Sequence, residues 1–475
     1  MNINEIVKEL NNLAWGPWML VLLVGTGIYL SCKVKFIQVK KFGYVMKNTL
    51  GKIFDKKQSK QGEITPFQAV STALAATVGT GNIAGVTGAI AVGGPGAVFW
   101  MWISAFFGMI TKYSEVVLAV KYREKNAQGD WVGGPMYYIK NGLGKKFNWL
   151  AIMFCVLGGL ASFGIGNMTQ VNTIANSINA ALLSINVNIN SFSFDFFGQF
   201  VPVSSIVVGL VVAIVIGLVL FGGIQRIGSF TETLVPAMAV VYVGAACILL
   251  LFNIQWIDDA FMMIFKGAFN TKAALGGAFG ITIMNTIQKG VGRGVFSNEA
   301  GLGSAPMAHA ATSETDPVKQ GLYGIFEVFM DTIVICTITS LVLLCGYFNG
   351  VSIEWGVGGG SELISQSFSL FFGKQIGSFI IAICISLFAL STIISWALYG
   401  SRCFEYIFGL KHIKYYQVLF IMIIVVGACL KFDLVWDIAD TLNGFMAIPN
   451  LIALLSLSKV VVECTKEHFD NDENK

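Results

Sequence analysis

A short run of small and polar residues interrupts a long apolar segment near the start of the sequence. Residues 66–91 are long and apolar enough to cross a bilayer at 1.5 Å of rise per residue, yet Gly79-Thr80-Gly81-Asn82 lies at their centre. Because glycine inside a helix costs about 1 kcal/mol relative to alanine, the run favours a helix that stops and starts again. In lipid, such a break is tolerated where its free N–H and C=O groups face protein or a polar cavity.

A helix broken at mid-membrane offers two kinds of binding group. The second half-helix presents a partially positive N-terminus with free N–H groups, which suits an anion. The first half-helix ends in free carbonyl groups, which suit a cation. Together they are what a carrier needs in order to hold a carboxylate, an ammonium group and a metal ion. The alternative interpretation is close packing of helices through small residues.

A second glycine-rich segment, at 276–306, resembles the first in its composition. It contains Gly290, Gly292, Gly294, Gly301 and Gly303, together with charged residues. If the first broken span opens a set of five spans, this segment opens a second set of five that crosses the membrane in the opposite direction. Interrupted helices at matching places in two inverted halves are the best sequence indication of a transport site, so the pattern predicts an ion-coupled carrier.

The composition is that of an all-α polytopic membrane protein. Of 475 residues, 55% are hydrophobic and 12% are charged, whereas a soluble domain is about 25% charged. Nine cysteines without CxxC spacing and three histidines in polar stretches argue against a disulfide framework or a metal site of His and Cys ligands. Residues 1–14 are polar and no small-residue cleavage site follows the first apolar run, so no signal peptide is predicted.

Eleven transmembrane helices are predicted from the apolar runs. They cover residues 15–32, 66–91, 95–121, 148–181, 201–221, 230–252, 276–305, 319–347, 375–400, 413–430 and 436–458. The map divides the chain into an N-terminal helix with a basic amphipathic segment (1–65), a first repeat (66–252), an interfacial connection outside the cell (253–275), a second repeat (276–458) and a cytoplasmic tail (459–475).

Lysine and arginine alternate between rich and poor loops along these eleven spans. The richest loops, 33–60 and 121–147, follow the first and third spans and so lie on the same side. Because basic loops face the cytoplasm, the N-terminus is predicted outside and the C-terminus in the cytoplasm.

Three stretches carry a resemblance to a known family. GTGNIAGVTGAIAVGGPGAVFWMWISAFFGMITKYSEVVLAVKYR (79–123), VGGPMYYI (132–139) and GVGRGVFSNEAGLGSAPMAHA (290–310) resemble the alanine/glycine:cation symporters of prokaryotes. The resemblance implies a LeuT-type inverted repeat of five plus five helices with one extra N-terminal helix. It also implies a multi-pass protein of the cell membrane that imports a small neutral amino acid (alanine or glycine, with glutamine a further candidate) with sodium, by alternating access.

Candidate substrate contacts lie in four spans. They are Gly79, Thr80, Gly81, Asn82, Phe163, Asn167, Gln170, Ser297, Asn298 and Trp396. Main-chain groups at the first break would bind the carboxylate, with the asparagine opening the second half-helix. In the fourth span, the amide side chains are three residues apart and share a face, and the phenylalanine would limit the size of the substrate side chain. The alternatives are helix capping by the serine and asparagine of the seventh span, interhelical bonding in the fourth, and plain packing of the tryptophan.

The predicted sodium site is made of oxygen atoms from two spans. Ser391 and Thr392 match by position the hydroxyl pair that, in LeuT-type carriers, joins carbonyls of the first core helix, which here are those of Ala75 and Val78. One bare ion would then tie the broken helix to the ninth span. The alternative is that both hydroxyls bond back to their own helix.

Ionisable residues in the spans have no role that the sequence settles. Arg293, with Glu299 or Glu327, would form either a cytoplasmic gate pair or a static pair, and Asp331 is left without a role.

Other classes of protein fit the sequence less well. An enzyme is not predicted, because HExxH and GxSxG are absent and GTGNIAG lacks the lysine of a phosphate loop. A channel would need a continuous pore lined by charges or filter carbonyls. The nearest alternative is the same carrier driven by protons. No cofactor, nucleic acid or obligate protein partner is expected; the expected partners are a small neutral amino acid, sodium and the lipid bilayer.

Overall fold

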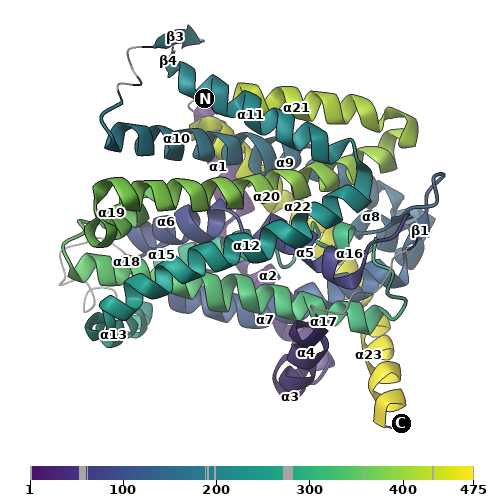
Figure 1. The fold of residues 1–475 in the computed structure, drawn as a ribbon. Helices are drawn as coiled ribbons and strands as arrows, with labels where there is room; N and C mark the ends of the chain where they lie inside the picture. The colour runs from purple at the N-terminus through teal and green to yellow at the C-terminus, as the bar shows by residue number, and fades with distance from the viewer. Residues whose placement is uncertain are drawn as a thin grey trace.

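Long helices that run in roughly the same direction form the body of the computed structural model (Figure 1). The helices α13 (Ile257–Phe269) and α19 (Ser361–Phe372) lie near one end of this bundle, and α23 (Ser458–Glu473) lies near the other. The structure describes all residues except 1–2, 53–59, 61, 188, 190–191, 197–198, 271–281, 358, 431–432 and 474–475.

Nine helical stretches of the described chain are long and apolar enough to cross a membrane. They are Glu5–Lys33, Ala97–Lys121, Lys145–Ser184, Val203–Leu220, Gly223–Phe252, Pro317–Phe348, Lys374–Phe408, Leu410–Cys429 and Asp437–Ser456. A tenth is the pair Pro66–Thr77 and Gly81–Gly93, which is bent by 48° at the predicted break. These ten correspond to ten predicted spans.

The eleventh predicted span, 276–305, is not confirmed as a single crossing. Its first residues lie outside the described ranges, and the helix α15 (Ile283–Asn298) has 16 residues, which is short for a crossing. The count of eleven therefore stays a prediction, whereas the mainly helical, multi-span architecture is confirmed.

The first half of the chain forms, in order, α1 (Ile3–Ala14), α2 (Pro17–Lys33), α3 (Ile37–Lys40), α4 (Phe42–Asn48), η1 (Leu50–Lys52), α5 (Pro66–Thr77), η2 (Gly81–Gly85), α6 (Val86–Gly93), α7 (Ala97–Lys121), α8 (Pro135–Tyr138), η3 (Ile139–Leu143), η4 (Lys145–Phe147), α9 (Asn148–Phe163), η5 (Gly164–Met168), α10 (Thr169–Ser184), α11 (Val203–Leu220) and α12 (Gly223–Phe252). Two short antiparallel hairpins, β1 (Glu124–Lys125) with β2 (Trp131–Val132) and β3 (Ser193–Phe196) with β4 (Gln199–Pro202), connect spans.

The second half continues with η7 (Ile254–Trp256), α13, α15, α16 (Pro306–His309), α17 (Pro317–Val328), η8 (Phe329–Cys336), α18 (Thr337–Phe348), α19, α20 (Lys374–Phe408), η9 (Leu410–His412), α21 (Ile413–Cys429), α22 (Asp433–Ser456) and α23. Helix α7 packs against α6, α15 and α16, and α20 packs against α5 and α16. The two interrupted helices are thus held by the same inner helices.

The first interrupted helix has a strong start and a defined stop. Thr65 and Gln68 form a capping box at the start of α5, with Pro66 in the first helical position. The helix ends at Val78, and the Gly79 N–H donates to the Asn82 side chain instead of continuing the α-helical ladder (2.9 Å). The π-helical turn η2 and then α6 follow.

The second interruption begins at Glu299 and not at the earlier glycines. Glu299 adopts the left-handed conformation (φ 56°), and Gly301 and Gly303 in the following loop have φ of 92° and 82°. Gly290 and Gly294 lie inside continuous helix and serve packing: a Cβ there would come within 2.4 Å of the main-chain oxygen of Ala97 and of Ser104 Oγ, respectively. Glycine in this segment therefore has two separate roles.

The C-terminal helix is fastened to the start of α17 outside the membrane spans. His468 Nδ1 lies 2.7 Å from Asp316, whose carboxylate also caps α17 through the N–H groups of Val318 and Lys319. Burial alone would raise the pKa of Asp316, but the hydrogen bond and charge of His468, with these N–H groups, together hold it below its ordinary value.

Replacing Gly290 by alanine should lower the melting temperature of the purified protein in detergent. The new methyl group would collide with main-chain atoms of α7, and overpacking of this kind costs about 1–3 kcal/mol. The control is Gly25→Ala in the interior of α2, where nothing lies within 4 Å of the added Cβ; it should be neutral or stabilising. Equal melting temperatures for the two variants would contradict the packing role.

Candidate functional site

The two interrupted helices meet at one buried carboxylate, that of Asp331. Asn82 Nδ2, next to the first break, donates to Asp331 Oδ1 (2.7 Å). Ser297 Oγ, in the last turn of α15, donates to Asp331 Oδ2 (2.9 Å), and Thr332 Oγ1 donates to the same oxygen (2.7 Å). All four side chains are at most 2% exposed. Asp331 lies in the π-helical turn η8, so three segments that are far apart in the sequence converge on it.

Two asparagine side chains take over the hydrogen bonds that the breaks leave open. Asn82 Oδ1 accepts from the Gly79 N–H (2.9 Å) while its amide nitrogen reaches η8. Asn298 Oδ1 accepts from the Ala300 N–H (3.0 Å), and its amide nitrogen donates to Thr332 Oγ1 (3.0 Å). Each asparagine therefore caps its own break and fastens that break to η8.

A cavity of about 270 Å³ reaches the first break. Its lining is Thr80, Gly81, Ala84, Gly85, Gly88, Ala89, Val92, Lys289, Arg293, Phe296, Gly359 and Gly360. The Arg293 guanidinium lies over the Phe296 ring, 5.1 Å from its centroid, and Phe296 packs beside Gly81. Two basic side chains and the start of η2 make this cavity attractive to an anion.

Of the predicted residues in the fourth span, Gln170 reaches the break. Thr80 Oγ1 donates to Gln170 Oε1 (3.0 Å). Phe163 packs instead against the rings of Tyr416 and Phe420, and Asn167 Nδ2 donates to the Phe420 carbonyl (2.8 Å). The structure therefore groups Phe163 and Asn167 with α21 and separates them from Gln170, because Asn167 lies inside the wider π-helical turn η5 whereas Gln170 lies in the α-helix that follows.

Trp396 bridges the second break and the fourth span. Its Nε1 donates to Glu299 Oε1 (3.0 Å), and its side chain fills the space beside Gly166, where a Cβ would lie 2.2 Å from Trp396 Cβ. The indole is 2% exposed. Trp396 is thus placed between two helix interruptions, in contact with Glu299.

Hydroxyl groups of α20 approach the end of α5. Thr392 Oγ1 donates to Phe388 O (3.0 Å) on its own helix and lies 3.3 Å from Ala76 O. Ser391 Oγ donates to Phe388 O on its own helix (2.7 Å). A Cβ at Gly79 would come within 2.4 Å of Thr392 Oγ1, so glycine is required for this approach. Oxygen atoms of α5 and α20 therefore lie close together, and oxygen ligands suit a hard cation such as sodium.

The described residues contain no group of three His, Cys, Asp or Glu side chains that could hold a metal ion. A cation at the junction of α5 and α20 would therefore depend on neutral carbonyl and hydroxyl oxygens.

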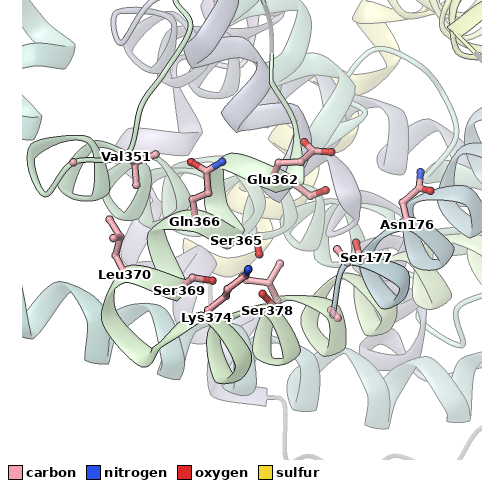
Figure 2. Close-up of a pocket in the computed structure, with 15 residues that line it drawn as sticks. Asn176, Ser177, Val351, Glu362, Ser365, Gln366, Ser369, Leu370, Lys374 and Ser378 are labelled. Carbon is pink, nitrogen blue, oxygen red and sulfur yellow. The ribbon is translucent and has the colours of Figure 1, made fainter. Parts of the chain in front are cut away.

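A larger cavity, of about 540 Å³, lies away from both breaks. Figure 2 shows side chains that line it, among them those of α10 (Asn176, Ser177), of α19 (Glu362, Ser365, Gln366) and of the start of α20 (Lys374, Ser378). None of the predicted substrate or sodium residues lines it.

The predicted gate pair is not present among the ion pairs of the described residues. Glu327 pairs with Lys112 (3.2 Å) and His309 (3.2 Å), and Arg293 lies over Phe296. The role of Asp331 was missed, because Ser297 is 34 residues before it and Asn82 is 249 residues before it. The available signal was an ionisable residue at membrane depth, which marks a functional position without naming its partners.

Comparison with known proteins gives a consistent result. The model of the sodium:alanine symporter family matches residues 1–475. The sodium/alanine symporter AgcS of Methanococcus maripaludis is 45% identical over 474 residues, which cover 98% of this chain and 97% of that protein. The probable sodium/glutamine symporter GlnT of Bacillus subtilis is 38% identical over 469 residues, covering 98% and 91%.

Among solved structures, the crystal structure of MhsT in complex with L-phenylalanine is similar, with a TM-score of 0.58. It covers 86% of this chain and 99% of that chain at 13% sequence identity, so the likeness shows the fold alone.

Asn82 and Asp331 should be energetically coupled. We expect the losses of unfolding free energy caused by Asn82→Ala and Asp331→Ala to be non-additive by about 0.5–3 kcal/mol in a double-mutant cycle. Either substitution alone removes the hydrogen bond between the two side chains, so the second substitution cannot remove it again. Unfolding in detergent measures the cycle. Pairing Asn82→Ala with Ser401→Ala is the control, since Ser401 Oγ donates to its own helix; its effects should add. Additive effects of Asn82→Ala and Asp331→Ala would contradict the tie.

Proposed function

Because the chain belongs to the sodium:alanine symporter family, we propose that it imports a small neutral amino acid, alanine or glycine, together with sodium. The family match and the multi-span helical architecture support transport as the function rather than catalysis. The observation that carries the proposal is the convergence of two helix interruptions on Asp331, next to a cavity that reaches one of them.

The substrate would bind through main-chain groups at the breaks. Its carboxylate would accept from the first N–H groups of η2, around Thr80 and Gly81, at the positive end of that half-helix. Its ammonium group would face the last carbonyls of α15 at Ser297 and Asn298, with Asp331 as the nearby negative charge. Gln170 is held against Thr80 and would complete the wall of the site.

The remaining predicted substrate residues would act at the edge of the site. Trp396 would shape it through its contact with Glu299, whereas Phe163 and Asn167 would shape it indirectly through α21. Glutamine stays a candidate substrate because the relative GlnT is named a probable sodium/glutamine symporter.

Sodium would bind between α5 and α20. The carbonyls of Ala75 and Val78 and the hydroxyls of Ser391 and Thr392 would supply its oxygen ligands, since a hydroxyl that donates to its own helix still has lone pairs. An ion there would fix the first break against α20 and thereby order the N–H groups that receive the substrate. This gives a physical reason for coupling between the two ligands.

The available driving force is sufficient for accumulation. One positive charge that moves down about 100 mV releases about 2.3 kcal/mol. A tenfold sodium gradient adds about 1.4 kcal/mol, so the sum supports a concentration ratio of several hundred. We propose that the two halves, 66–252 and 276–458, form the inverted repeats that alternate access, with the N-terminus outside and the C-terminus in the cytoplasm.

Uptake of radiolabelled alanine into proteoliposomes tests the coupling ion. At constant pH, uptake should require a sodium gradient and should stop when choline replaces sodium. Persistent uptake without sodium would favour the proton-driven alternative. A competition panel of glycine, L- and D-alanine, serine and glutamine then defines the substrate.

Replacing Thr392 by alanine should raise the sodium concentration for half-maximal uptake by tenfold or more, a loss of about 1.4 kcal/mol of ion binding. The substitution removes one oxygen next to Gly79 without adding bulk. Ser386→Ala on the same helix is the control, because its hydroxyl donates to Ala382 O (2.6 Å); its sodium dependence should match the parent protein. An unchanged sodium requirement in Thr392→Ala would remove this residue from the site.

A further inference from the structure

Beyond the substrate and sodium sites, a set of buried ionisable groups lies at the second break. Lys112 and Glu115 of α7, Glu299 at the break, His309 of α16 and Glu327 of α17 are between 0% and 3% exposed. Near the start of α7, Trp100 Nε1 donates to the Ala268 carbonyl of α13 at one end of the bundle. Lys112 is 12 residues further along α7, so the set lies about 18 Å from Trp100 toward the opposite end. By the predicted topology, that end faces the cytoplasm.

Glu327 contacts both Lys112 and His309 of this set. Lys112 Nζ lies 3.2 Å from Glu327 Oε1, and His309 Nε2 lies 3.2 Å from Glu327 Oε2. On the other side of the imidazole, Gln320 Nε2 is 2.9 Å from His309 Nδ1, while Gln320 Oε1 accepts from Thr312. The amide therefore donates to Nδ1, which makes His309 a neutral imidazole with its hydrogen on Nε2. Lys112 is left as the cation that compensates Glu327.

Hydrogen bonds from the protein stabilise Glu115 as a carboxylate. Its Oε1 accepts from the N–H groups of Gly301 (3.0 Å) and Gly303 (3.1 Å) and from Asn450 Nδ2 (2.5 Å). Three donors on one oxygen favour the ionised form. Its other oxygen is buried with no hydrogen-bond partner among the described residues, so a second negative charge nearby is unfavourable.

Glu299 has the least support for a negative charge. It is the residue at the C-terminal end of α15, where the helix dipole is negative and disfavours an anion. Among the residues that the structure describes, two neutral donors reach its carboxyl group: Trp396 Nε1 to Oε1 (3.0 Å) and Ser304 Oγ to Oε2 (2.5 Å). In the short contact either oxygen can carry the hydrogen, so the geometry also accommodates Glu299 donating to Ser304.

The other ionisable groups near this set do not compensate Glu299. Asp331 of η8 is satisfied by its own three donor side chains, and Tyr399 of α20 and Tyr138 of α8 are buried and neutral. The ionisable groups that interact with Glu299 are Lys112, Glu327 and Tyr399. Further groups interact with other members of the set: Glu115, His309, Asp331 and Tyr138. Together these groups hold more acids than bases, and Lys112 is their single full cation.

We propose that Glu299 is a proton-binding site whose proton must be held while the predicted cytoplasmic side is closed and is released when that side opens to water. A neutral Glu299 keeps its bonds to Trp396 and Ser304 in this structure, where the residue is 3% exposed and so shut off from water. A charged Glu299 would lose its hydration on burial and would be repelled by Glu327, while the attraction of Lys112 is shared with Glu327; water would stabilise the charge and so favour the open form. The proton thus regulates closure, while sodium remains the driving ion.

An infrared measurement tests the proton itself without any transport. In proteoliposomes at neutral pH, the parent protein should show a carboxylic-acid carbonyl band that the Glu299→Gln variant lacks. Ser304→Ala should shift this band and not abolish it, because it removes one hydrogen bond to the same group. This variant keeps the test open if Glu299→Gln does not fold. A spectrum without a band that depends on Glu299 or responds to Ser304 would overturn the proposal.

A transport measurement tests the consequence, and this part rests on the proposed function. With sodium saturating, alanine uptake should fall by up to about tenfold per pH unit as the cytoplasmic-side pH rises past the titration of Glu299. Glu299→Gln is neutral at every pH and should lose this dependence, whereas Glu354→Gln, at an exposed site, should keep it. A Glu299→Gln variant with the pH profile of the parent would overturn the regulatory role. Failure of sodium dependence alone would contradict the proposed function and leave the infrared result unchanged.

Discussion

A break in a membrane helix leaves main-chain groups that lipid cannot satisfy, and this constraint organises the centre of the molecule. Asn82 accepts from the Gly79 N–H at the first break, and Asn298 accepts from the Ala300 N–H at the second. The amide nitrogens of the same two side chains reach Asp331 and Thr332 in η8. The side chain that caps each break also binds η8, so a movement of either break is transmitted to the same turn of a third span.

Three π-helical turns surround this centre, and each has a local consequence. In η8 the wider turn leaves the Asp331 carbonyl near Asn82 Nδ2 (3.3 Å) in addition to its side chain. In η5 the turn brings Gly166 against Trp396, and in η2 it continues the first break. Such turns have weaker ladders than α-helix and often occur at functional sites. They are places where these long spans can change direction without losing the rest of their hydrogen bonds.

The sequence indicated an interruption in both glycine-rich segments, but composition did not show which residues of the second segment form it, for a physical reason. Glycine lowers helix stability wherever it stands, but it also permits close packing, and composition does not separate these uses. Gly79 is at a true break, whereas Gly290 and Gly294 lie in continuous helix against α7. Ten spans followed from hydropathy because burial in lipid requires it. Asp331 could not be placed, since two of its contacts join residues that are 34 and 249 positions away in the sequence.

Buried carboxyl groups dominate the electrostatics of the centre. The centre holds Asp331 beside a site that would receive a substrate carboxylate, and further carboxyl groups lie at the second break. In a medium of low dielectric constant, such like charges repel strongly unless a cation accompanies them. A sodium ion between α5 and α20 would offset that repulsion before the substrate arrives. On the proposed mechanism, a proton bound to one carboxyl group at the second break would relieve the same excess of acids. Ion binding and closure would then both compensate the buried negative charge.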